Sequence, residues 1–244
     1  MKIIEQGHEI LFPKRTDQYT WSSLLPLVET AGRTCYKSKS DEAPGEFVRR
    51  KLVKTGHHSV IEHVNITVRF ITDRGVTHEM VRHRLAAYSQ ESTRYCDYGG
   101  AGDVVFIRPV WCVEPLLGEW DVEPERDRLA ALYRRSDVDR QNPRYNTDGL
   151  DYAWLAAMAV NERQYKRLRE GGWAPQKARS ILSNSLKTEI VMTANLREWR
   201  HVFELRCSKA AHPQIRELMI PLRDELAGLL PEIFEDLADQ GMKA

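Results

Sequence analysis

Apolar and polar residues alternate most regularly between residues 64 and 70, where Val64, Ile66, Val68 and Phe70 are separated by Asn65, Thr67 and Arg69. This period of two predicts a strand with one buried face. Residues 20–35 instead carry apolar side chains at helical spacing and predict a helix. The same reasoning predicts further strands at 3–12, 103–110 and 188–193, and further helices at 41–56, 76–84, 152–170, 175–183, 196–207 and 213–239.

Glycine, proline and asparagine mark the ends of several of these elements. Gly171 and Gly172 end the helix that begins near residue 152, and Asn195 caps the helix that follows it. Pro221 and Pro231 predict kinks or breaks in the C-terminal helix.

Residues 119–150 are highly charged and irregular, and we interpret them as a peripheral insertion around a short helix at 128–133. Such a segment suits a lid or an interface element. We therefore predict a single domain spanning residues 1–244, with this insertion as its elaboration.

Composition narrows the classes of function. The chain has 36 Lys and Arg against 35 Asp and Glu, so its net charge of +1 argues against sequence-independent binding to nucleic acid. Its apolar runs are too short for a membrane span, and the first residues contain no signal-peptide core. The four cysteines are scattered, which favours reduced thiols in a cytoplasmic protein without a membrane partner.

The densest chemistry lies at residues 82–95, where Arg82, His83 and Arg84 are followed after seven residues by Ser92, and then by Arg94 and Tyr95. Clustered arginines repel one another unless an anion lies between them, and each guanidinium can bind phosphate or carboxylate through two donors. For Arg-His-Arg alone, a solvated basic turn is the alternative. We predict that the segment begins at a helix end and continues as a loop.

Histidines 57, 58 and 63 surround Glu62, but their spacing matches neither usual metalloprotease motif, so we predict no metal. Two interpretations stay open: hydrogen-bonded structural histidines between a helix and a strand, or ligand contacts.

The predicted helix after Asn195 directs free N–H groups and a positive partial charge at any anion at its start. A capped surface helix is the alternative. No Gly-x-Gly-x-x-Gly or Walker-type loop occurs, so a nucleotide must be bound in another way. Cys207 follows Arg206, whose charge could activate it, but the sequence shows no base for it and burial is the commoner fate of cysteine.

Arg-His-Arg-(x)7-Ser resembles the signature of the flavin-dependent thymidylate synthases. Residues 57–63, the Ala-Arg-x-x-Leu element at 178–182, Asn195-x-Arg197 and Arg206 agree with that family's spacing, so the resemblance covers roughly residues 55–100 and 175–220. It implies an α+β fold with a central, largely antiparallel sheet flanked by helices. It also implies a homotetramer with shared sites at subunit interfaces.

The implied reaction is the reductive methylation of dUMP to dTMP, with methylenetetrahydrofolate as carbon donor and NADPH as hydride source through FAD. The resemblance assigns FAD binding to Ser59, Arg82, His83, Arg84, Gln90, Asn195, Arg197 and His201. It assigns dUMP binding to Glu79, Arg82, Gln90, Glu91, Ser92, Arg94, Arg179 and Arg206.

Arg206 is the predicted catalytic residue, because the sequence offers no cysteine in a nucleophile setting. A guanidinium near N3 and O4 of the pyrimidine would stabilise negative charge on the ring. Ser92, without an activating base, is predicted to be a phosphate ligand.

Ser89 and Gln90 stand where many members have Asn-Glu, Ala87 where a serine is frequent, and Ser183 where a proline is frequent. None of these differences removes a charged ligand. A family relative that methylates UMP remains an alternative, and a nucleotide- or RNA-binding protein is the alternative of another class.

Overall fold

The computed structural model describes residues 1–14, 20–39, 43–99, 104–112, 117–119 and 146–242, so most of the predicted insertion at 119–150 and its short helix lie outside the described residues. Two compact units share the chain. One comprises Met1–Gly7, Ile71–His78 and Gln90–Ile190, and is called unit 1; the other comprises His8–Phe70, Glu79–Ser89 and Val191–Ala244, and is called unit 2.

Four strands form a sheet in the order β2-β3-β7-β4, with bounds β2 (Gly7–Phe12), β3 (Asn65–Asp73), β4 (Ala86–Gln90) and β7 (Lys187–Asn195). In β3 the predicted alternation is confirmed, because Val64, Ile66, Val68 and Phe70 are all buried. The Thr67 and Thr193 hydroxyls are 2.9 Å apart, while Leu196 N–H donates to the Val64 carbonyl. Contacts in this reversed order identify β3 and β7 as antiparallel neighbours.

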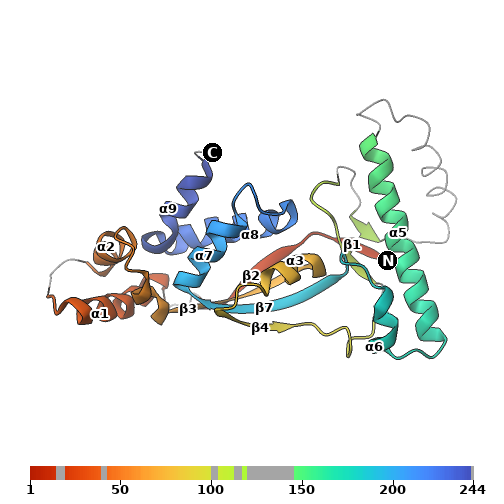
Figure 1. Cartoon of the computed structure of the whole chain (residues 1–244), viewed down its shortest axis with the longest axis horizontal. Helices are drawn as coiled ribbons and strands as arrows, with labels where there is room; N and C mark the ends of the chain where they lie inside the picture. Colours follow the sequence, from red (N-terminus) through yellow and green to blue (C-terminus); the bar gives the residue numbers. More distant parts are fainter. Residues whose placement is uncertain (15–19, 40–42, 100–103, 113–116, 120–145, 243–244) are drawn as a thin grey trace. The chain divides into compact units, whose positions relative to one another are not determined.

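Unit 2 gathers most of the helices: η1 (Trp21–Leu24), α1 (Leu25–Tyr36), α2 (Pro44–Phe47), η2 (Val48–Val53), η3 (His58–His63), α7 (Leu196–Arg206), α8 (Pro213–Leu229) and α9 (Pro231–Met242). Helices α7, α8 and α9 contact one another (Figure 1). Trp199 is fully buried and stacks on Phe203, whose ring meets Phe234 edge to face. These aromatic contacts fix α7 against α9.

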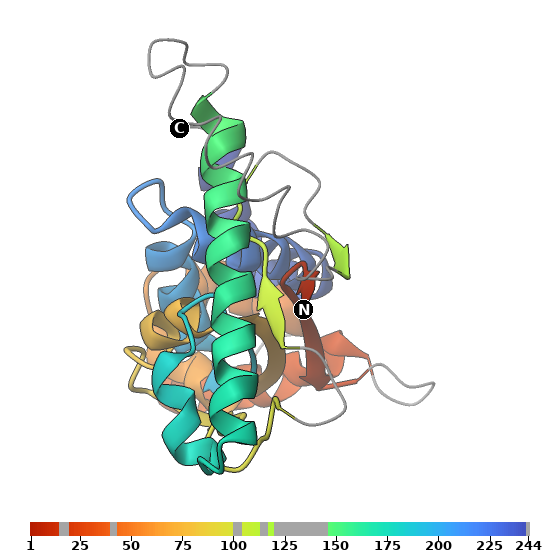
Figure 2. The same ribbon diagram turned by 90° about the vertical axis from the view of Figure 1, so that its right-hand side faces the viewer.

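Unit 1 contains β1 (Lys2–Ile4), β5 (Val105–Ile107), β6 (Gly118–Glu119), α5 (Asn146–Glu170), α6 (Pro175–Ala178) and η4 (Arg179–Ile181). Its three strands have the order β5-β1-β6, with β1 parallel to β5 and antiparallel to β6. The long helix α5 lies beside α6 (Figure 2). Leu155, Tyr165 and Phe106 belong to the apolar core of this unit.

Several predicted boundaries are wrong. The strand predicted at 3–12 is divided into β1 and β2, which belong to different sheets. The helix predicted at 20–35 begins as a 3-10 turn, and the one at 41–56 continues as the π-helix η2. The helix predicted at 76–84 ends at Met80 as α3 (Arg74–Met80), and residues predicted to form a loop make β4. Pro221 lies inside α8, whereas the helix does break before Pro231.

Among the helices that the structure describes, none is both long enough and apolar enough to span a membrane.

Candidate functional site

The start of α7 is built as the sequence predicts. Asn195 has extended backbone angles, and its side-chain oxygen accepts a hydrogen bond of 2.8 Å from the backbone N–H of Glu198. Arg197 is exposed and its guanidinium lies 2.6 Å from the Glu62 carboxylate on η3. His201, one turn further along, is also exposed. Arg197 and His201 therefore face solvent near the helix N-terminus, where an anion can reach them.

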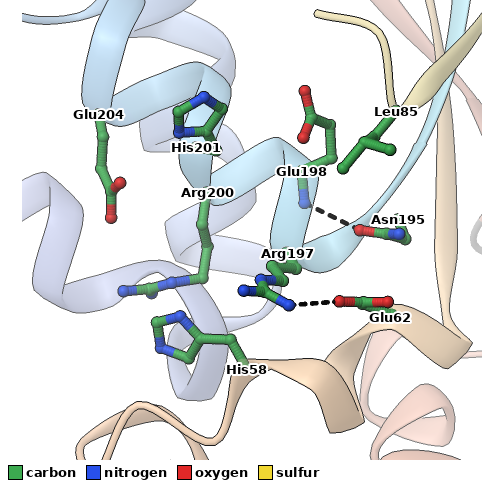
Figure 3. A pocket seen from close by; sticks show the side chains of 9 residues that line it. All are labelled: His58, Glu62, Leu85, Asn195, Arg197, Glu198, Arg200, His201 and Glu204. Atoms are coloured by element: carbon green, nitrogen blue, oxygen red, sulfur yellow. Dashed lines mark hydrogen bonds and ion pairs between the residues drawn. The ribbon is translucent and has the colours of Figure 1, made fainter.

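A pocket of about 440 Å³ opens at this end of α7 (Figure 3). Its lining combines cationic, acidic and amide side chains with one exposed leucine: His58, Glu62, Leu85, Asn195, Arg197, Glu198, Arg200, His201 and Glu204. Three residues predicted to bind the cofactor, Asn195, Arg197 and His201, thus share one pocket. Their donors suit the phosphates and the polar ring edge of a nucleotide cofactor.

The histidine-rich segment forms the short 3-10 helix η3. The His58 ring nitrogen Nε2 lies 3.3 Å from the Val53 carbonyl, and the His57 ring packs against Tyr36. His58 also lines the pocket, so it has both a structural contact and access to a ligand. Within the described ranges, no group of three His, Cys, Asp or Glu side chains is arranged to hold a metal ion. The absence of zinc stays a prediction.

Arg206 lies at the end of α7 and is held from two directions. Its Nε donates to His83 Nε2 at 3.0 Å. Its terminal nitrogens donate to Glu79, at 2.8 Å to the side-chain Oε2 and at 3.1 Å to the backbone carbonyl. The structure therefore brings together three residues that the sequence assigned to two different ligands: His83 for the cofactor, and Glu79 and Arg206 for the nucleotide.

His83 differs from its arginine neighbours in the signature, because it is buried while Arg82 and Arg84 are exposed. Burial, followed by the charges of Arg206 and His201, lowers the pKa of His83 to about 4. His83 is consequently neutral at pH 7. Ser59 is exposed on η3.

The remaining predicted nucleotide ligands lie in unit 1, where Gln90 donates from Nε2 to the hydroxyls of Thr77 (3.0 Å) and Thr188 (3.3 Å). Glu91 accepts hydrogen bonds from Tyr98 Oη at 2.7 Å and Lys187 Nζ at 3.0 Å. The Glu91 carboxylate is thus already bound by protein groups.

Ser92, Arg94 and Arg179 are less constrained. The Ser92 hydroxyl accepts from the Arg94 backbone N–H at 3.3 Å, and the Arg94 guanidinium lies over the Tyr95 ring. Arg179 donates to the Thr93 hydroxyl at 3.1 Å. Both arginines are exposed and remain able to bind phosphate.

Sequence reasoning missed several residues of this region. Glu198 and Arg200 line the pocket, and both are buried. Arg200 forms a bidentate ion pair with Asp236, at 2.7 Å for each terminal nitrogen, which makes it a structural cation. In the sequence, Glu198 stands three residues after Asn195, the spacing of an ordinary helix cap. From that spacing alone, the burial of the Glu198 carboxylate could not be predicted.

Cys207 is not an activated thiol. Burial raises its pKa to about 11, and the charge that most opposes this rise is that of Arg223. The thiol of Cys207 is therefore protonated at neutral pH.

Known proteins similar to this chain are thymidylate synthases or carry that description. Residues 20–232 match the Thy1 family, described as thymidylate synthase complementing protein. Flavin-dependent thymidylate synthases from Mycolicibacterium gilvum and Mycobacteroides abscessus are 33% and 35% identical over 216 residues, covering 86% of this chain and 78% of each relative. The crystal structure of Thymidylate Synthase X from Helicobacter pylori with FAD and dUMP superposes with a TM-score of 0.65 at 20% identity, covering 96% of this chain and 99% of that one.

Proposed function

This chain belongs to the flavin-dependent thymidylate synthase family, and from that premise we propose how its residues carry out the reductive methylation of dUMP to dTMP. Methylenetetrahydrofolate gives the one-carbon unit and leaves as tetrahydrofolate. FAD, when bound, would supply the redox chemistry that links NADPH to the reduction of the transferred carbon. Methylation at C5 releases the C5 proton.

The single observation that supports this proposal most strongly is the pocket at the start of α7. Asn195, Arg197 and His201 line it together, at the N-terminal end of α7 where the helix dipole is positive. Such a site holds the phosphates of FAD without a Gly-rich loop. Exposed Arg82, Arg84 and Ser59, with Gln90, complete the proposed cofactor contacts.

Arg206 activates the pyrimidine in this proposal. Of its five N–H groups, three are engaged by His83 and Glu79, which leaves one N–H on each terminal nitrogen without a partner among the described residues. These two donors suit the O4 oxygen, and also N3 once the pyrimidine has lost its N3 proton. Negative charge that develops on the ring is stabilised there, which raises the nucleophilicity of C5.

Phosphate binding falls to the exposed guanidinium groups of Arg94 and Arg179 and to the Ser92 hydroxyl. Within the part of the chain that the structure describes, no acidic side chain pairs with these groups, so a dianion gains charge-assisted hydrogen bonds without displacing an existing ion pair. Glu79, Arg82, Gln90 and Glu91 form the remainder of the proposed dUMP site.

We assign the active form to a homotetramer with shared sites, each subunit being a single catalytic domain. The four cysteines are free thiols, which supports a cytoplasmic enzyme.

The test compares Arg206→Ala, Arg206→Lys and the control Arg49→Ala, whose guanidinium pairs with Glu235 on the surface of unit 2. Methylation is assayed with dUMP and with UMP, in the presence of FAD, methylenetetrahydrofolate and NADPH. We expect turnover of dUMP, a loss of about 10²–10³ in rate for Arg206→Ala with FAD still bound, and partial rescue by lysine. Arg49→Ala should match the wild type.

A folded, FAD-loaded Arg206→Ala enzyme with the wild-type rate would refute the role of Arg206. Methylation of UMP in preference to dUMP would refute the proposal that dUMP is the substrate.

A further inference from the structure

Glu198 is a buried carboxylate. Its role at the start of helix α7 does not explain why its side chain is buried. The residue is 5% exposed, and its backbone N–H donates to the Asn195 cap. Its carboxylate does not complete a capping box but lies 3.4 Å from His83 Nδ1. Burial raises the pKa of Glu198, with His201 acting in the opposite direction. Because a buried carboxylate is costly, a neutral side chain would serve stability at least as well.

The contacts of His83 fix where its proton lies. A guanidinium can only donate hydrogen bonds, so the Nε2 atom that faces Arg206 Nε at 3.0 Å must be the acceptor. A neutral imidazole carries one proton, which is therefore on Nδ1, the atom that faces Glu198. Carboxylate, imidazole and guanidinium thus form a chain from Glu198 through His83 to Arg206.

This chain determines the orientation of the guanidinium. Glu79 holds the two terminal nitrogens, and His83 holds Nε on the other side. If His83 changed to the Nε2–H tautomer, it would present an N–H to the Arg206 N–H, and the contact would be lost. A group that favours Nδ1–H consequently also favours the observed orientation of Arg206.

We propose that Glu198 is a positioning residue: it holds His83 in the Nδ1–H tautomer, so that His83 Nε2 fixes the guanidinium of Arg206 toward the pyrimidine. The expected effect on kcat rests on the proposed function. The assignment of the His83 tautomer does not.

The experiment uses the FAD-loaded enzyme and three variants. In Glu198→Ala the carboxylate oxygen that lies near Nδ1 is removed; in Glu198→Gln an amide oxygen can still face Nδ1–H. Glu162→Gln is the control, because Glu162 is an equally buried carboxylate in unit 1, paired with the N-terminal amine and Lys166. The measurements are kcat and KM for dUMP, the Kd of FAD, and the ¹⁵N NMR signals of labelled histidine, with His83 assigned from its loss in His83→Gln.

We expect the wild-type His83 signals to show Nδ1–H, and Glu198→Ala to show both tautomers. Its kcat should fall about tenfold at saturating FAD and dUMP, because the electrostatic contact that orients His83 is lost, while Glu198→Gln stays within about threefold of wild type. Glu162→Gln should lower the melting temperature and leave kcat and the His83 tautomer unchanged.

Three outcomes would overturn the proposal: an Nε2–H tautomer in the wild type, an unchanged kcat in Glu198→Ala, or an equal loss in Glu198→Gln. If Glu198→Ala does not fold, the His83 tautomer in the wild type and the kcat of Glu198→Gln still test the proposal. A wild type that shows Nδ1–H but does not methylate dUMP would refute the proposed function and leave the tautomer assignment intact.

Discussion

At the scale of single residues, the site depends on polar groups whose protonation is set by burial. His83 stands between two exposed arginines in the sequence, yet its ring is buried and its neighbours are Glu198, His201 and Arg206. A neutral imidazole accepts from Arg206, whereas an imidazolium would repel it. The same burial that shapes the site therefore makes it sensitive to acid.

The lowered pKa of His83 predicts a loss of stability in acid. The folded pKa of about 4 lies below the ordinary value of 6.5, so the unfolded chain binds the extra proton first as the pH falls. This contribution is fully present above pH 6.5, decreases from pH 6.5 to 4, and amounts to about 3 kcal/mol at most. Urea unfolding of the wild type and His83→Gln across this range is the measurement; parallel curves would contradict the prediction.

Ser92→Ala should retain turnover and bind the nucleotide more weakly. Among the described residues, the hydroxyl has a hydrogen bond only with the Arg94 backbone N–H, so no base activates it as a nucleophile. Loss of one hydrogen bond to a phosphate costs about 1.5–3 kcal/mol, or about ten- to hundredfold in affinity. Steady-state kinetics should place this effect in KM. A covalent nucleotide adduct on Ser92 would disprove it.

At the scale of elements, α7 organises unit 2. Its N-terminus faces the pocket, its buried side carries Trp199 and Phe203, and its last residue is Arg206. A displacement of this one helix would therefore affect the cofactor pocket and the catalytic arginine together.

The cap of α7 can be separated from its ligand role. Asn195→Ala should lower stability by about 1 kcal/mol, because the Glu198 N–H loses its acceptor. Asn195→Asp should keep that stability, since a carboxylate oxygen accepts the same bond, while its negative charge opposes the phosphates of FAD. Melting temperature and the Kd of FAD measure the two effects. Equal FAD affinity in Asn195→Asp and wild type would remove Asn195 from the proposed site.

At the scale of the whole molecule, the proposed ligands are divided between the two units, with Gln90, Glu91, Ser92, Arg94 and Arg179 in unit 1 and the others in unit 2. The division falls within the signature itself, between Ser89 and Gln90. Strands β3 and β7 also contribute residues to both units. The proposed ligands therefore come from segments that are far apart in the sequence.

Assembly and cofactor binding should be coupled if the sites are shared between subunits. Light scattering should give a mass about four times the 28.3 kDa of the chain. Dilution that dissociates the oligomer should release FAD in parallel, because each proposed site then loses part of its ligands. Monomers that keep FAD with unchanged affinity would contradict shared sites.

The sequence alone predicted the elements whose signals are local. The alternation in β3, the Asn195 cap and the break before Pro231 are confirmed, because side-chain period, capping and proline geometry act within a few residues. The resemblance carried by residues 82–95 also identified the family, since a specific ligand set requires a specific spacing.

Only the tertiary structure decided which of those residues meet. Strand β4 could not be predicted from Ala-Ala-Tyr-Ser-Gln, because its neighbour in the sheet, β7, comes from a distant part of the chain. The division of residues 3–12 between two sheets has the same cause. The burial of Glu198 against His83, 115 positions away in the chain of 244, depends on packing between separate elements, and no local pattern records such a contact.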